Sequence, residues 1–202
     1  MGGKNWARQA RGGGPVRIIA GEARGRKLAT LPGQHTRPTL ERVKEGIFSA
    51  VQFWLPGARV LDLFAGGGQL GLEAVSRGAA GCTFVEQDAK AAALIGQNAK
   101  AVGLEDRCRV TRSEVYAFLA RGAGQFDLIL MDPPYHEGFY PGVLEAAAKV
   151  AAPGCLALCE SEPEAQMPAE AAGFVLEKQY RYGTVLVSRY KMTAESEDSE
   201  NQ

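Results

Sequence analysis

The chain has 202 residues, 46% of them hydrophobic, which is enough for one α/β domain with a two-sided core and a small appendage. Its 23 basic and 23 acidic residues cancel, so bulk charge does not indicate a polyanionic partner. The four cysteines form no C-x-x-C pair, only two histidines occur, and no apolar stretch reaches membrane-spanning length. These features argue against a zinc site, a disulfide framework or a transmembrane helix, and we expect a metal-free monomer of the reducing cytoplasm.

The N-terminal quarter of the chain is basic. Met1 to Lys44 carries ten Lys and Arg residues against two acids, a net charge of +8, which leaves −8 for the remainder. We expect residues 1–15 to be a disordered leader and residues 192–202 a disordered acidic tail. Residues 16–20 and 26–31 flank a Gly-Glu-Ala-Arg-Gly turn and predict a β-hairpin, followed by a helix from Thr39 to about Trp54.

Together, residues 16–56 are expected to form an extension that meets phosphates. The basic side chains assigned to this contact are Arg17, Arg24, Arg26, Lys27, Arg37 and Arg42.

From residue 57 the chain alternates between strands and helices. Apolar runs at residues 60–64, 82–86, 108–111, 126–131 and 155–159 predict buried strands, and the segments 70–77, 89–102, 114–120 and 140–150 predict helices between them. A short Arg-Tyr-Gly turn separates two further strands at 174–180 and 184–190, which predicts an antiparallel hairpin. Residues 57–191 are therefore expected to form a Rossmann-like α/β domain with a seven-stranded, mostly parallel sheet whose last strand is antiparallel.

A glycine-rich turn follows the first of these strands. Gly66, Gly68 and Gly71 satisfy G-x-G-x-x-G, and Glu86 stands twenty positions after Gly66, where a ribose-binding acid is expected. This pattern leaves an NAD-dependent oxidoreductase open as an alternative. Asp62 favours S-adenosylmethionine instead, because its carboxylate can interact with the methionine end of a sulfonium ligand and would repel a pyrophosphate.

The residues expected to bind the cofactor are Asp62, Phe64, Ala65, Gly66, Gly68, Glu86, Gln87, Ser113 and Glu114.

The strand at 126–131 ends in Asp132-Pro133-Pro134-Tyr135, the most specific motif of the chain. An amine on a nucleobase is a poor nucleophile, and the Asp132 carboxylate and the Pro133 carbonyl can each accept one of its hydrogen bonds and orient it. Two consecutive prolines restrict the loop and remove backbone donors. Tyr135 offers a flat face on which an extruded base can stack. We therefore expect Asp132, Pro133, Pro134 and Tyr135 to form the catalytic turn.

With these motifs the chain resembles the RsmD family of class I methyltransferases between about Val16 and Tyr190. The resemblance rests on Arg17-Ile18-Ile19-Ala20-Gly21, Arg24-Gly25-Arg26-Lys27-Leu28, Arg37-Pro38-Thr39, Arg42-Val43-Lys44-Glu45 with Phe48, Leu61-Asp62-Leu63-Phe64-Ala65-Gly66 and Asp132-Pro133-Pro134-Tyr135. It implies S-adenosylmethionine as cofactor and transfer of a methyl group to the exocyclic N2 of a guanine in small-subunit (16S) ribosomal RNA, free or within the assembled small subunit. It also implies that the basic extension faces RNA.

Three positions depart from the usual family pattern. Gly67-Gly68 stands where Ser-Gly is usual, Ser113 where Asn or Asp is frequent, and Tyr135 where Phe is usual. Because Tyr135 also fits adenine-N6 enzymes, an adenine-N6 methyltransferase acting on DNA or RNA is the alternative within this class. A third hypothesis is an RNA-binding scaffold without activity, against which the intact Asp132 turn argues.

Overall fold

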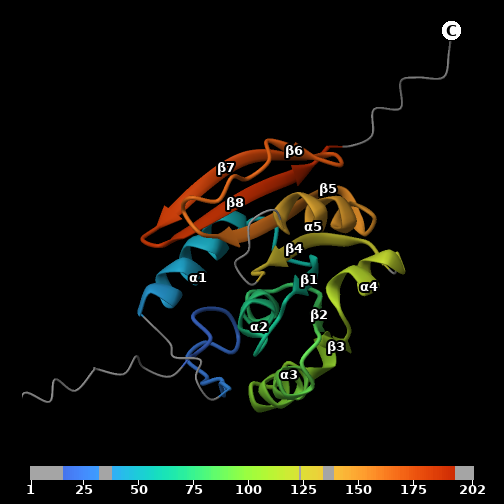
Figure 1. Cartoon of the computed structure of the whole chain (residues 1–202). Helices are drawn as coiled ribbons and strands as arrows, with labels where there is room; N and C mark the ends of the chain where they lie inside the picture. Colours follow the sequence, from blue (N-terminus) through green and yellow to red (C-terminus); the bar gives the residue numbers. More distant parts are fainter. Residues whose placement is uncertain (1–15, 32–37, 123, 134–138, 194–202) are drawn as a thin grey trace, which may run out of the picture.

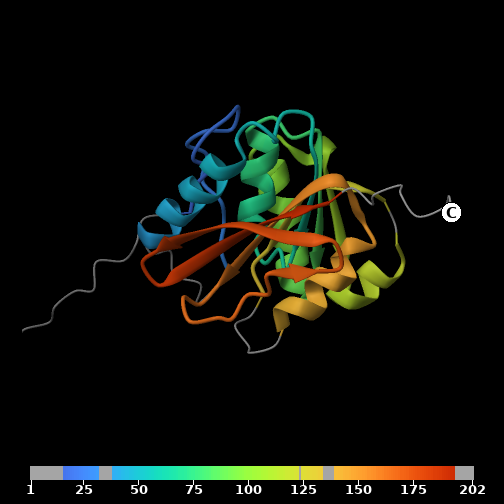
Figure 2. The ribbon, with the colours of Figure 1, turned by 90° about the horizontal axis from the view of Figure 1, so that it is seen from above.

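The computed structural model describes residues 16–31, 38–122, 124–133 and 139–193. In this part of the chain one sheet lies between two layers of helices (Figure 1). α1 (Pro38–Val51), α2 (Gln69–Ser76) and α3 (Ala89–Ala101) cover one face, and α4 (Val115–Ala120) and α5 (Phe139–Ala148) cover the other (Figure 2). The expected disorder of residues 1–15 and of most of the acidic tail falls outside the described residues.

Eight strands form the described sheet, in the order β3-β2-β1-β4-β5-β8-β7-β6. They are β1 (Arg59–Leu63), β2 (Gly81–Glu86), β3 (Cys108–Arg112), β4 (Phe126–Met131), β5 (Ala151–Ser161), β6 (Glu170–Ala171), β7 (Phe174–Tyr182) and β8 (Val185–Met192), with a 3-10 turn at Glu105–Arg107. The first five pair in parallel and the last three are antiparallel. The predicted Rossmann-like fold is thus confirmed, with one strand more than expected, because the two-residue β6 is too short to show a periodicity.

The continuous apolar runs form strands that are buried on both faces. In β4, Leu128 and Leu130 belong to the core under α1–α3, whereas Ile129 and Met131 belong to the core under α4 and α5. Successive side chains of a strand point to opposite faces, so a two-sided core requires apolar residues at every position. This arrangement leaves the ends of the strands as the places for polar function.

The N-terminal extension is part of the first core layer. Ile18, Leu28 and Phe48 are buried in the same cluster as α2 and β1. The predicted hairpin forms as one isolated bridge between Arg17 and Lys27, without two continuous strands. The reason is that the backbone N–H groups of Ile19 and Ala20 donate to Glu73 of α2, so they are not available for a strand ladder. The helix begins at Pro38 and ends at Val51, one residue before the expected start at Thr39 and three before the expected end.

Candidate functional site at the carboxyl ends of the strands

A cavity of about 300 Å³ opens at the carboxyl edge of the parallel strands. It is lined by Phe64, Val85, Glu86, Gln87, Ser113, Glu114, Val115 and Asp132. Open α/β sheets bind ligands at this edge, and small-molecule sites begin at this size. The structure therefore brings five of the nine predicted cofactor residues, Phe64, Glu86, Gln87, Ser113 and Glu114, together with the predicted catalytic Asp132.

The turn after β1 has a backbone conformation that exposes its main-chain atoms to a ligand. Phe64, Gly66 and Gly68 have φ angles of 62°, 52° and 79°, in the left-handed region. A non-glycine residue in this region costs free energy and often marks a functional site. A side chain at Gly66 would meet no atom within 4 Å, so open space lies beside that residue. Gly66, Gly68 and Ala65 do not line the cavity directly; they shape the turn beside it.

Glu86 ends β2 and fastens the turn to the neighbouring strand. One carboxylate oxygen accepts the N–H of Gly66 at 2.8 Å, and the other accepts the N–H of Asp88 at 2.8 Å. A carboxylate has about four lone-pair positions, so both oxygens can accept further hydrogen bonds from the hydroxyls of a ligand. Glu114 faces the same cavity and caps α4 through the N–H of Ala117, whereas Ser113 donates its hydroxyl to the Glu114 carbonyl. The helix cap is thus Glu114 and not Ser113.

Asp132 directly follows β4, whereas Ser113 follows β3 at the edge of the sheet. In the strand order β3-β2-β1-β4, the two residues therefore line opposite sides of the cavity. Asp132 keeps a solvent-exposed side, but the protein around the rest of the carboxyl removes water from it and raises its pKa to about 6. Pro133, the next residue, is buried. Above this pH Asp132 is an ionised acceptor in a partly dry environment, where its hydrogen bonds are strong. Pro134 and Tyr135, the rest of the predicted catalytic turn, lie outside the described residues.

Asp62 lies beneath the glycine turn and has only 2% of its surface exposed. Its carboxylate accepts the N–H of Gly71 at 2.8 Å, which holds the first turn of α2 against β1. Burial is the main reason that its pKa rises to about 7, opposed by the Gly71 hydrogen bond and increased by Asp132 and Glu86. Asp62 does not line the cavity, so its contact with a methionine group stays a prediction.

Residues 16–191 match the protein family described as Conserved hypothetical protein 95, the family of the RsmD enzymes. The chain belongs to the RsmD family. The Ribosomal RNA small subunit methyltransferase D of Escherichia coli K12 is 34% identical over 188 residues, which cover 92% of this chain and 94% of that protein. YlbH of Bacillus subtilis is 35% identical over 183 residues, covering 87% and 98% of the two chains. The solved structure of yhhF from Escherichia coli has a TM-score of 0.80 at 34% identity and covers 90% of this chain and 99% of its own.

The basic residues of this RsmD-family chain are not gathered at the carboxyl edge. Arg24 lies in a turn that packs on the end of α2, where Glu22 N donates to the Ser76 carbonyl at 2.9 Å. Because α2 starts at the glycine turn and runs away from it, Ser76 lies at the amino edge of the sheet. Arg26 approaches Gly103, which follows α3 at the same edge.

The other basic residues assigned to phosphates have different surroundings. Arg17 is exposed and forms an ion pair with Glu41 at 3.0 Å. Lys27 and Arg42 are also exposed. Arg37 lies outside the described residues. The RNA contacts of all six residues therefore stay predictions, and Arg24 and Arg26 would meet RNA well away from Asp132.

Two buried polar residues of the RsmD-family chain were not predicted from the sequence. Asn98 of α3 accepts the N–H of Ala29 at 2.8 Å and donates to the carbonyls of Ala29 and Gly67, both at 3.0 Å. It thereby joins the N-terminal segment to the glycine turn. No sequence signal distinguishes it from an ordinary polar residue on a helix.

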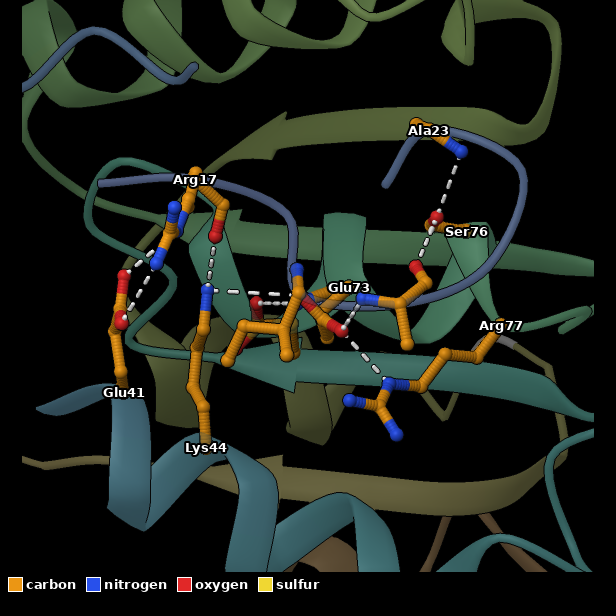
Figure 3. A network of polar contacts seen from close by, with 11 residues as sticks. Arg17, Ala23, Glu41, Lys44, Glu73, Ser76 and Arg77 are labelled. Atoms are coloured by element: carbon orange, nitrogen blue, oxygen red, sulfur yellow. Dashed lines mark hydrogen bonds and ion pairs between the residues drawn. The ribbon is translucent and has the colours of Figure 1, made fainter. Parts of the chain in front are cut away.

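The second is Glu73 of α2, which is fully buried. It accepts the N–H groups of Ile19 at 2.7 Å and Ala20 at 3.0 Å, as well as Arg77 Nε at 2.7 Å (Figure 3). Lys44 Nζ of α1 lies 3.6 Å away and donates to the Arg17 carbonyl at 2.8 Å. Burial lowers the pKa of Lys44, and the attraction of Glu73 opposes that shift. This network fastens both α1 and the N-terminal segment to the helix that begins at the glycine turn.

Within residues 16–31, 38–122, 124–133 and 139–193 there is no cluster of His, Cys, Asp and Glu that could hold a metal ion. The same ranges contain no helix that is long and apolar enough to span a membrane. All four cysteines are free thiols.

Proposed function

We propose that this chain is an S-adenosylmethionine-dependent methyltransferase that methylates the exocyclic N2 of a guanine in small-subunit ribosomal RNA. The observation that carries the proposal is the cavity in which the glycine-turn residue Phe64, the strand-end acid Glu86 and the catalytic Asp132 meet at one edge of the sheet. Family membership and the named activity of the Escherichia coli relative support the same substrate class.

The described residues fit the cofactor. Glu86 has acceptor capacity left for ribose hydroxyls, and Ser113 and Glu114 edge the part of the cavity beyond it, where an adenine would lie. The turn at Gly66 leaves room for the backbone to approach a ligand closely. S-adenosylmethionine supplies a methyl group that its sulfonium already activates.

The work left for the protein is to position and desolvate the base amine. The ionised Asp132 carboxylate accepts one amine N–H, which orients the nitrogen lone pair and stabilises the positive charge that develops on the nitrogen. Asp132, or water after methyl transfer, accepts the proton that leaves. The exposed side of Asp132 admits the base, and extrusion of a base from RNA costs a few kcal/mol.

The test is radiolabelled methyl transfer to ribosomal RNA and to small subunits from cells that lack this protein, followed by mapping and mass analysis of the labelled nucleoside. We expect N2-methylguanosine at one position, and loss of at least about a hundredfold in rate for Asp132→Ala. Label in N6-methyladenosine would overturn the base assignment. Calorimetric binding of NADH in preference to S-adenosylhomocysteine would overturn the whole proposal.

The same assay distinguishes free RNA from the assembled subunit as substrate, because both are offered to the same enzyme. The cytoplasmic location, the monomeric state and the absence of a metal requirement stay predictions from the sequence.

A further inference from the structure

A second carboxyl group, that of Glu160, stands next to Asp132 on the neighbouring strand. The last register pair between β4 and β5 is Met131 with Cys159, so Asp132 and Glu160 are the next positions along. Leu130 and Leu158, two residues earlier on each strand, both point into the core under α1–α3. Side chains alternate along a strand, so Asp132 and Glu160 leave the sheet on that same face. Neighbouring strands lie about 4.8 Å apart, so the backbones of the two residues are separated by about this distance.

Glu160 is a largely buried acid near the end of β5. Only 7% of its surface is exposed, and its carboxyl has no hydrogen bond to any residue that the structure describes. A carboxyl that is largely withdrawn from water without a hydrogen bond from the surrounding residues is available to bond a ligand. Burial, and then the negative charges of Asp132 and Asp62, raise the pKa of Glu160 well above its usual range. This favours its protonated form, which is a hydrogen-bond donor.

The position of Glu160 relative to the cofactor cavity determines which part of the substrate Glu160 can contact. The cavity is lined by residues at the ends of β1, β2 and β3, and by Asp132 at the end of β4. Glu160 is on β5, the next strand beyond β4, and does not line that cavity. The target base approaches Asp132 from outside the cofactor cavity, so that its amine reaches the Asp132 carboxylate. It therefore lies on the β5 side of Asp132, next to Glu160.

We propose that Glu160 is a specificity-determining residue that donates a hydrogen bond to the O6 oxygen of the target guanine while Asp132 accepts from its N2 amine. This inference rests on the proposed function. Guanine carries the amine and O6 at the two ends of its Watson–Crick edge, separated by about the spacing of two neighbouring strands, ~4.8 Å. The Watson–Crick edge of adenine ends in the C2 hydrogen instead of an acceptor, so adenine would leave the Glu160 donor unpaired.

A second unpaired polar group near Asp132 provides a control. The hydroxyl of Tyr140, at the start of α5, is buried without a hydrogen-bond partner among the described residues. It belongs to the helix layer on the other face of the sheet from Glu160. Tyr140→Phe therefore removes an orphan donor of the same neighbourhood without changing the Glu160 carboxyl.

The experiment compares a guanine with 2-aminopurine at the mapped target position of an RNA assembled by splinted ligation. 2-Aminopurine keeps the C2 amine and lacks O6. For the wild type we expect kcat/KM for methyl transfer to be higher on guanine by about tenfold or more. Glu160→Met should lower methylation of guanine by a similar factor and leave 2-aminopurine unchanged, so that the preference disappears. Glu160→Gln, which keeps an N–H donor, and Tyr140→Phe should both retain the preference.

Equal loss on both bases in Glu160→Met, with the preference retained, would overturn the inference and show a structural role. The inference would also be overturned if the preference for guanine disappeared in Tyr140→Phe and survived in Glu160→Met. S-adenosylhomocysteine binding by calorimetry verifies that each variant is folded, and Glu160→Val replaces Glu160→Met if the latter does not fold. A wild type that transfers no methyl to N2 of guanine would overturn the proposed function, and this inference with it.

Discussion

Replacing Glu73 by alanine is expected to cost about 4 kcal/mol of the free energy of unfolding. The side chain accepts two backbone N–H groups and Arg77 Nε within 3.0 Å, and Lys44 Nζ lies 3.6 Å away. Removing it takes the acceptor from Ile19, Ala20 and Arg77, at roughly 1–3 kcal/mol for each donor that stays buried. Water can reach Ile19 and Ala20 in part, because both are half-buried, so the costs do not simply add.

The loss of the ion pair with Lys44 sets the lower bound of this effect, because Lys44 then keeps only its hydrogen bond to the Arg17 carbonyl. Its side chain is 5% exposed, and breaking a buried ion pair by removing one partner costs about 3–5 kcal/mol. For a domain of this size, 4 kcal/mol corresponds to a decrease of about 10 °C in Tm. Urea unfolding followed by circular dichroism at 25 °C measures the free energy directly, with the slope of the transition as a check for two-state behaviour.

Glu41→Ala is the matched control, because Glu41 forms an ion pair with Arg17 of the same N-terminal segment. This contact is exposed: 41% of the Glu41 side chain and 56% of the Arg17 side chain are accessible. An exposed pair contributes about 0.5 kcal/mol, so this variant should be almost as stable as the wild type. Glu73→Gln keeps an acceptor and loses the charge, and should lie between the two. If Glu73→Ala loses no more stability than Glu41→Ala, the network does not hold the N-terminal segment and the reasoning is refuted.

Three further predictions follow from the site and its supports. Asn98→Ala should lower the free energy of unfolding by about 3 kcal/mol. The variant should also bind S-adenosylhomocysteine more weakly in calorimetry, because the Gly67 carbonyl loses its hydrogen bond, and an unchanged affinity would contradict a role of Asn98 at the glycine turn. The proposed role of Asp132 needs its negative charge, which stabilises the positive charge that develops on the amine, and its pKa is about 6. We therefore expect kcat to decrease as pH falls through 6 and to stay flat above about 7, and an acid limb near 4 would argue against this environment. Gly71→Ala should destabilise the protein by about 1–3 kcal/mol in urea unfolding, since its Cβ would lie 2.3 Å from Phe84 Cε1, whereas Gly96→Ala, with no atom within 4 Å, should be neutral or stabilising.

Local sequence patterns predicted most of the elements. β4 was expected at residues 126–131 and has those bounds, and the ends of the other core helices and most strands differ by one or two residues. The glycine turn, Glu86 and Asp132 were predicted to share one edge of the sheet, and Phe64 of that turn lines one cavity with Glu86 and Asp132, whereas the glycines lie beside it. The strand β5 is longer than predicted, since it begins at Ala151, where a proline and a glycine interrupt the apolar pattern.

Other features depend on partners that are far away in the sequence. Arg24 and Arg26 were identified as basic residues, but only the packing of their turn on Ser76 places them at the amino edge of the sheet. Glu73 and Asn98 look like ordinary polar helix residues, and their burial depends on segments more than fifty positions away. Glu160 carried no motif, and its place beside Asp132 follows from the register of β4 and β5.

The sequence by itself determined the alternation of strands and helices, the glycine turn and the place of Asp132 at the end of a strand, because periodicity and turn chemistry act over a few neighbouring residues. The tertiary structure determined which polar groups are buried, which of them have hydrogen-bond partners, and which charged residues lie at the carboxyl edge of the sheet. Those properties arise from strand order and register, which bring distant segments together and remove water from the groups between them.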